Sequence, residues 1–214
     1  MERKKDYING LTGKKLIFTL LGVFMFLNFV RAQDAKYYFD KGKSEFENWK
    51  YENAIFNFTK AIELKSDYAE AYYYRGNAYR ELQKYEEAIA DYTKVIELKP
   101  DDTDAYNNRG LSYSVLKKYN EAILDFTKAI ELKPEDAEGY LNRGFTYYDL
   151  KKYNESISDY TKAIDINPDN SLAYYNRGFV YKASGNINKA CEDWTKAYSL
   201  GYSNAKELLD KDCK

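Results

Sequence analysis

A glycine recurs every 34 residues through most of the chain, and a tyrosine four residues before it keeps the same interval. The glycines are Gly42, Gly76, Gly110, Gly144 and Gly178. All three prolines, Pro100, Pro134 and Pro168, follow the same spacing. A period of this length means that one supersecondary unit is copied and stacked on its neighbours, which share a continuous core. The sequence therefore predicts a repeat architecture instead of a single globular core.

Each 34-residue unit has the hydrophobic spacing of two helices. In residues 69–102, one helical face carries Tyr72, Gly76 and Tyr79 at spacings of four and three. A second face of the same kind follows a short polar turn, and Pro100 ends it because proline is costly inside a helix. The unit is therefore expected to be a helix-turn-helix.

This pattern resembles the tetratricopeptide repeat, with aromatic-x₃-Gly-x₂-Tyr in the first helix and Ala-x₃-aromatic in the second. The resemblance implies an all-α fold, a right-handed α-solenoid of five helix-turn-helix units followed by a capping helix at 205–214. The repeat domain covers 35–204, and its units are 35–68, 69–102, 103–136, 137–170 and 171–204.

The residue before each glycine departs from the family, which usually has leucine there. It is arginine in four units and lysine in the first. The second helix carries aspartate at one fixed phase in the same four units, and Asn57 in the first. We therefore expect half-buried Arg–Asp pairs, within or between repeats. We also expect the glycines to allow close helix approach, with small Ala or Ser side chains facing them.

The first 32 residues have the character of a leader. A basic segment precedes an apolar run from Leu16 to Val30, and polarity rises directly after Ala32. This order is typical of a secretory signal peptide, here cleaved near Ala32–Gln33. The alternative is an uncleaved apolar anchor, although the run is short for a membrane span. The sequence thus predicts an exported protein, periplasmic, in the cell envelope or secreted, with no stable span after cleavage.

Composition excludes several classes of function. Histidine is absent, which removes imidazole metal sites and the usual general base. Without residues 1–32 the chain has 27 basic and 32 acidic residues, so nucleic acid is not an expected partner. No phosphate-binding loop, metal motif or activated nucleophile is evident. We expect no catalytic residue, no metal, no cofactor and no enzymatic activity.

Two cysteines, Cys191 and Cys213, lie in the last repeat and in the capping helix. Both are a similar number of residues from the turn near Gly201, so they could meet in an antiparallel pair. In an oxidising compartment a disulfide is plausible. Two unlinked thiols are the alternative.

The family resemblance also implies a ligand-binding groove, lined by fixed positions of each first helix. In this chain those positions are rich in aromatic and asparagine side chains, which could anchor a peptide and bond its backbone. The candidate residues are Phe39, Tyr73, Asn77, Asn107, Asn108, Leu141, Asn142, Phe145, Tyr148, Tyr175, Asn176 and Phe179. About half of the aromatic residues are expected to pack between repeats instead.

These observations favour a non-enzymatic interaction scaffold of the cell envelope that holds a peptide segment or a partner protein. Two alternatives stay open, an exported module that binds glycans or peptidoglycan through the aromatic groove, and a self-associating spacer. The partner and the oligomeric state do not follow from the sequence.

Overall fold

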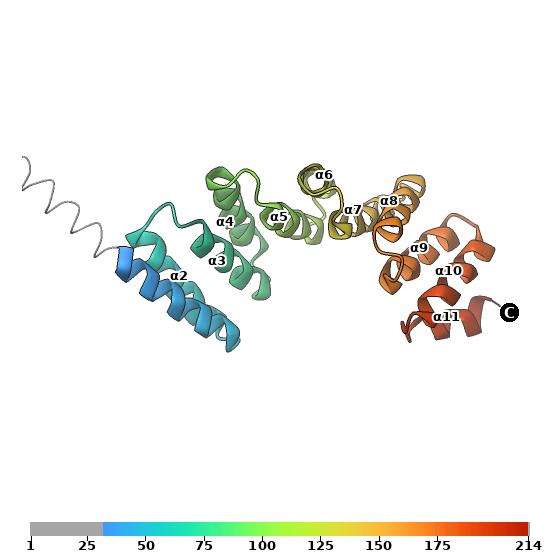
Figure 1. The fold of residues 1–214 in the computed structure, drawn as a ribbon, viewed down its shortest axis with the longest axis horizontal. Helices are drawn as coiled ribbons and strands as arrows, with labels where there is room; N and C mark the ends of the chain where they lie inside the picture. Colours follow the sequence, from blue (N-terminus) through green and yellow to red (C-terminus); the bar gives the residue numbers. More distant parts are fainter. Residues whose placement is uncertain (1–31, 214) are drawn as a thin grey trace, which may run out of the picture. The chain divides into compact units, whose positions relative to one another are not determined.

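The computed structural model describes residues 32–213, which form helices joined by short turns, with no strand among them (Figure 1). The all-α repeat fold is confirmed for this part of the chain. The chain divides into two compact units, one ending at Leu82 and one beginning at Gln83. The division falls in the turn between the two helices of the second repeat. Each unit is described by itself.

The first unit contains a helix at 32–47, α2 (Tyr51–Leu64) and α3 (Ala69–Glu81), and α2 packs against α3. On α2, Ala54, Phe58 and Ala61 recur at spacings of four and three, and all three are fully buried. This apolar stripe forms the core of the unit.

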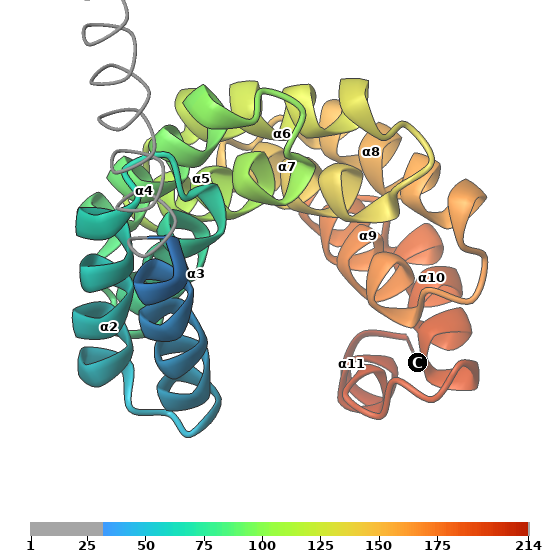
Figure 2. The same ribbon diagram turned by 60° about the vertical axis from the view of Figure 1, so that its left-hand side comes forward.

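The second unit continues the same pattern in pairs of helices. They are α4 (Tyr85–Leu98), α5 (Thr103–Val115), α6 (Tyr119–Leu132), α7 (Ala137–Asp149), α8 (Tyr153–Ile166), α9 (Ser171–Ala183), α10 (Ile187–Ser199) and α11 (Ala205–Asp212). Each helix packs against the next along the chain (Figure 2). The first helices of successive repeats also meet, α5 with α7 and α7 with α9. They therefore form one layer, and the second helices cover it.

The turn inside each repeat is set by backbone hydrogen bonds. Between α5 and α6, the amide of Lys117 donates to Ser114 and that of Lys118 donates to Tyr113. This is the helix-ending motif in which one residue adopts a left-handed conformation. That residue recurs every 34 positions with φ between 58° and 87°, as Trp49, Gln83, Lys117, Lys151 and Gly185. In the last repeat it is a glycine, which adopts this conformation without strain.

The turns between repeats place a capping side chain directly before the next helix. The side chain of Asp102 accepts from the amide of Ala105 at 2.9 Å, and Asn170 accepts from Ala173 at 3.0 Å. Such caps bind amides that the helix itself cannot pair. Each first helix in this unit therefore starts at a defined residue.

At the repeated glycine, an aromatic ring of the second helix also lies close to the backbone. The space beside Gly42 and Gly110 is filled by the ring of the aromatic residue 16 positions later, Phe58 or Phe126, and a methyl group there would lie 2.7 Å from the ring. The space that a side chain would need at these glycines is therefore filled by a buried aromatic ring. In the fourth repeat the small residue also takes part, since the Ser156 hydroxyl donates to the carbonyl of Gly144 at 2.7 Å.

Candidate functional site

The predicted groove positions of the second unit lie on α5, α7 and α9, the layer of first helices. Asn107 is buried, Phe145 is 50% exposed, and the others are partly buried. Because α7 contacts both α5 and α9, the structure brings these side chains onto neighbouring helices. The partly buried ones are Asn108, Leu141, Asn142, Tyr148, Tyr175, Asn176 and Phe179.

The remaining candidates belong to the first unit. Phe39 lies on the helix at 32–47, and Tyr73 and Asn77 lie on α3, all partly buried. Phe39 packs into an aromatic cluster, with its ring centroid 4.9 Å from that of Tyr68 and 5.7 Å from that of Tyr74. Phe39 is therefore largely occupied by packing inside its own unit.

The aromatic candidates of the second unit divide into packed and open positions. Tyr175 lies 4.5 Å from Tyr202, and Phe179 lies 5.6 Å from the buried Trp194, both measured between ring centroids. Phe145 is the exposed member and is on the middle helix, α7. An exposed phenylalanine between partly buried polar side chains is suited to anchoring a ligand.

Two asparagines of the set carry buried polar atoms without a hydrogen-bond partner among residues 32–213. They are Oδ1 of Asn107 and Nδ2 of Asn142. Buried polar atoms are nearly always paired, and an unpaired one costs free energy. Asn107 is itself buried, whereas Asn142 is only partly buried and carries an unpaired donor that a peptide carbonyl could complement.

The first helices are held in place by an arginine that joins three helices. Arg109 on α5 donates from Nε and Nη2 to both carboxylate oxygens of Asp125 on α6, at 2.8 and 2.7 Å. Its Nη1 donates to the hydroxyl of Thr93 on the preceding α4 at 3.0 Å. Arg143 and Arg177 repeat this geometry. The expected Arg–Asp pairs are confirmed in these three repeats, and they form within a repeat.

Burial and pairing act against each other in these ion pairs. The hydrogen bonds that Arg143 donates to Asp159 raise the pKa of Arg143, although burial lowers it. Burial raises the pKa of the Asp125 carboxyl, and Arg109 lowers it only in part. Loss of hydration therefore offsets much of the attraction, so that the pair adds little net stability but is costly to break on one side.

The threonine partners were missed by the sequence interpretation. Thr59, Thr93, Thr127 and Thr161 are 34 residues apart and each accepts a hydrogen bond from the arginine 16 positions later. The regular interval was visible in the sequence. Threonine on a helix surface carries no sign of a partner, so the spacing alone did not suggest one.

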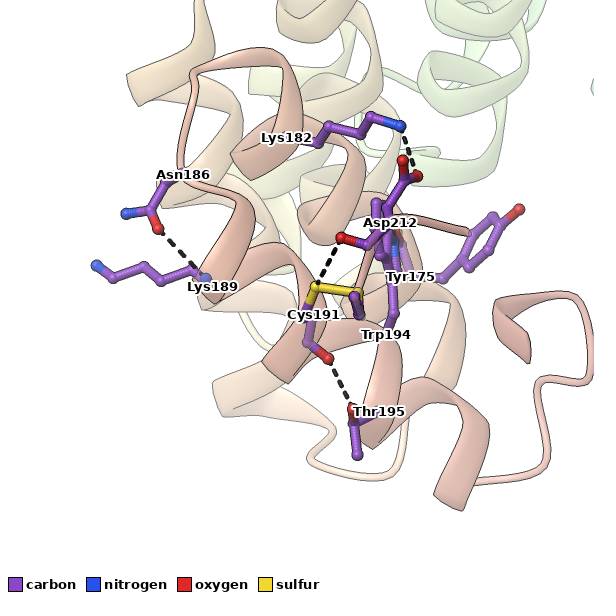
Figure 3. The surroundings of a disulfide bond; sticks show 9 residues. Tyr175, Lys182, Asn186, Lys189, Cys191, Trp194, Thr195 and Asp212 are labelled. Atoms are coloured by element: carbon purple, nitrogen blue, oxygen red, sulfur yellow. Dashed lines mark hydrogen bonds and ion pairs between the residues drawn. A yellow bond between two sulfur atoms is a disulfide. The ribbon is translucent and has the colours of Figure 1, made fainter. Parts of the chain in front are cut away.

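Cys191 on α10 and Cys213 at the end of α11 are joined in a disulfide, with their Cα atoms 5.7 Å apart (Figure 3). The same helix is held by an ion pair of 2.5 Å between Asp212 and Lys182 on α9. Leu208 and Leu209 pack against the cluster around Trp194. Helix α11 is thus attached to both helices of the last repeat.

Two other kinds of site are absent from the part of the chain that the structure describes. No group of three or more Cys, Asp or Glu side chains between residues 32 and 213 could hold a metal ion. None of the helices in that range combines the length and apolar character of a membrane span. The leader predicted at residues 1–32 lies almost wholly outside the described residues.

Solved structures with the same fold confirm the architecture. A crystal structure of MamA is 24% identical, with a TM-score of 0.74, and the match covers 81% of this chain and 95% of that one. MamA from Desulfovibrio magneticus RS-1, residues 41 to the end, gives a TM-score of 0.75 at 24% identity over 79% and 96%. YrrB, described as a TPR protein with an unusual peptide-binding site, gives 0.68 at 25% identity over 81% and 90%.

A comparison with curated protein sequences gives no match. Family models do match. A TPR repeat model matches residues 35–81, 76–114 and 146–185, which is more than half of the chain. Two further models, both described as tetratricopeptide repeat, match 103–136 and 172–200. The 34-residue period and the paired helices are thus accounted for, and the chain belongs to the tetratricopeptide repeat family.

Proposed function

We propose that this protein is a non-enzymatic interaction scaffold of the cell envelope that binds a peptide segment or partner protein along its first helices. The repeat fold itself supports a role as a protein-interaction scaffold, and the family is typically non-enzymatic. Similarity to YrrB, which is described as having a peptide-binding site, supports a peptide as ligand.

The observation that carries the proposal is the surface of α7. The exposed ring of Phe145 lies three residues beyond Asn142, whose side-chain Nδ2 is buried without a partner among residues 32–213. Residues three apart are neighbours on a helix surface. An apolar anchor beside a free amide donor fits an extended peptide, which offers both side chains and backbone carbonyls.

Two features support export. The N-terminal segment has the order of charge and hydrophobicity of a signal peptide. The disulfide between Cys191 and Cys213 is typical of proteins in oxidising compartments. An N-terminal anchor in place of a cleaved leader would leave the binding surface in the same compartment. The mass of the purified protein distinguishes the two, since cleavage near Ala32 removes the leader.

Site-specific photocrosslinking in living cells tests the binding surface. A photoreactive phenylalanine analogue replaces Phe145, and in a matched control it replaces Leu124 on α6, which is 70% exposed and lies on a second helix. Discrete protein adducts from position 145 and none from position 124 are the expected result. Addition of Asn142→Ala should weaken the adducts from position 145. Equal labelling at both positions, or none, would contradict binding along the first helices.

A further inference from the structure

Helix α11 continues the period of the repeats. Leu208 and Leu209 stand 34 residues after Tyr174 and Tyr175, which lie on α9. Helix α11 therefore occupies the place of the first helix of a sixth repeat, although it is only 8 residues long. No second helix follows it within the described residues.

The segment 202–213 covers groove positions at this end of the unit. The ring of Tyr202 lies 4.5 Å from Tyr175, and the Asp212 carboxylate lies 2.5 Å from the Lys182 ammonium. Burial raises the pKa of Tyr175, and the charge of Glu207 adds to this effect. Tyr175 is one of the predicted groove residues, and Lys182 lies on the same helix, α9.

The noncovalent attachment of α11 is weak. Its sole fully buried residue is Ala205, and the side chain of Asn204 makes no capping hydrogen bond. Isolated helices of this length are not stable in water. Its further contacts include the partly buried Leu208 and Leu209 against the Trp194 cluster, the Lys206 ammonium 5.8 Å from the centre of the Tyr198 ring, and the ion pair to Lys182, whose side chain is 40% exposed.

The disulfide stabilises the docked position of α11. It joins the far end of α11 to α10 and closes a loop with a sequence separation of 22 (Figure 3). In the chain-entropy model, a loop of this length is favoured about 100-fold by the cross-link. The closed position of α11 therefore depends mainly on the oxidation state of two cysteines.

The disulfide is open to an attacking thiol. Both cysteines line a surface pocket of about 690 Å³, together with Ile187, Asn188, Glu192 and Thr195. A thiolate of a dithiol reductant can attack one sulfur and form a mixed disulfide, releasing the other cysteine as a thiolate. The second thiol of the reductant then displaces the first cysteine. Two electrons and two protons pass to the protein, which gains two thiols, and the reductant becomes a disulfide.

We propose that α11 is a lid latched by the Cys191–Cys213 disulfide, and that reduction by a dithiol releases the lid and uncovers Tyr175 and Lys182 on α9. The consequence for ligand binding rests on the proposed function. The opening itself does not, because it involves only residues of this chain.

Hydrogen exchange of the full chain, purified as the cell processes it, tests the latch. In the oxidised protein the amides of 208–212 should be protected. Dithiothreitol should accelerate their exchange about 100-fold while leaving α5 to α8 unchanged. A Cys191→Ser, Cys213→Ser double variant is the matched control, since it should exchange rapidly with or without dithiothreitol.

Trp194 gives a second readout. It is fully buried, and its indole N–H donates to the Tyr175 carbonyl at 3.2 Å. In a Trp49→Phe background, which removes the exposed tryptophan, acrylamide should quench Trp194 more strongly after reduction. Unchanged exchange and unchanged quenching after complete reduction, verified by thiol counting, would overturn the latch. Neither measurement uses a ligand, so failure of the proposed function would leave both results interpretable.

Discussion

The first repeat and the last three repeats are built on one pattern but are held together differently. In the last three, an arginine on the first helix is bound by an aspartate and a threonine. In the first repeat Lys41 is exposed, and the side-chain amide of Asn57 donates to its own helix, at the Asn53 carbonyl. Aromatic rings replace the ion pair there, with Phe58 stacked 5.9 Å from Tyr74.

The difference follows from position in the array. The arginine of an internal repeat has a threonine on the preceding second helix as its third partner. The repeat pattern begins with residues 35–68, so no repeated threonine precedes Lys41. A guanidinium there would keep fewer of its hydrogen bonds while still losing hydration. The ion pairs therefore appear in repeats whose arginine also has a threonine partner on the preceding second helix.

Removal of a single carboxylate should produce the largest loss of unfolding free energy. Asp125→Ala leaves Arg109 half-buried without its charged partner, and we expect a loss of about 3 kcal/mol in unfolding free energy. Asn57→Ala, the matched change in the first repeat, should cost only about 1 kcal/mol, because it removes one neutral hydrogen bond. Urea denaturation followed by circular dichroism measures both. Equal losses would mean that the ion pair has no special role.

A methyl group added at the repeated glycine should next separate the first repeat from the fourth. In Gly42→Ala the new carbon would lie 2.7 Å from the buried Phe58 ring, and this overpacking should cost about 2 kcal/mol. In Gly144→Ala the nearest atom, Asp159 Cβ, is 3.3 Å away. The better helix propensity of alanine, about 1 kcal/mol, should then nearly cancel the strain. Similar melting temperatures for the two variants would refute this explanation.

Alkaline pH should lower the stability of the fourth repeat through Tyr160, at a position where the first repeat has a phenylalanine. Tyr160 is buried, and burial, with smaller effects of Asp149 and Asp159, raises its pKa above the ordinary value of 10.0. Phe58 occupies the corresponding position in the first repeat. Above pH 10 the unfolded tyrosine ionises while the folded one stays neutral. Stability is therefore complete below pH 10 and falls above it by about 1.4 kcal/mol per pH unit.

The Tyr160→Phe variant isolates this contribution from that of the other tyrosines. The difference in denaturation midpoint between the wild type and the variant should shift in favour of the variant between pH 8 and pH 11. A constant difference across that range would show that Tyr160 ionises equally in the folded and unfolded chains.

Removal of a threonine hydroxyl should produce the smallest loss of stability. Thr161 donates to the Ile157 carbonyl and accepts from Arg177. Thr195, at the corresponding position of the next repeat, donates to the Cys191 carbonyl, and no arginine among residues 32–213 donates to it. Valine at position 161 should therefore cost about 1 kcal/mol more than valine at 195, because only the first loses an arginine contact. Thermal unfolding compares the two variants directly. Equal losses of stability would show that the arginine contact of Thr161 does not stabilise the protein.

The 34-residue interval was enough to predict the helices and much of the set of residues that hold them. It placed the buried alanines and rings, the repeat boundaries near the prolines, and the arginine and aspartate that later meet as pairs. Periodicity is a local property of the chain, since it determines which side chains share one face of a helix.

The contacts between helices depended on the tertiary structure. The repeat interval could not show that Phe126 lies against Gly110, that Thr93 binds Arg109, or that residues 202–213 cover Tyr175. The face of a helix on which a side chain lies does not determine which atoms of the next helix fill the space opposite it. That choice is made by side-chain volume and hydrogen-bond geometry when the helices pack.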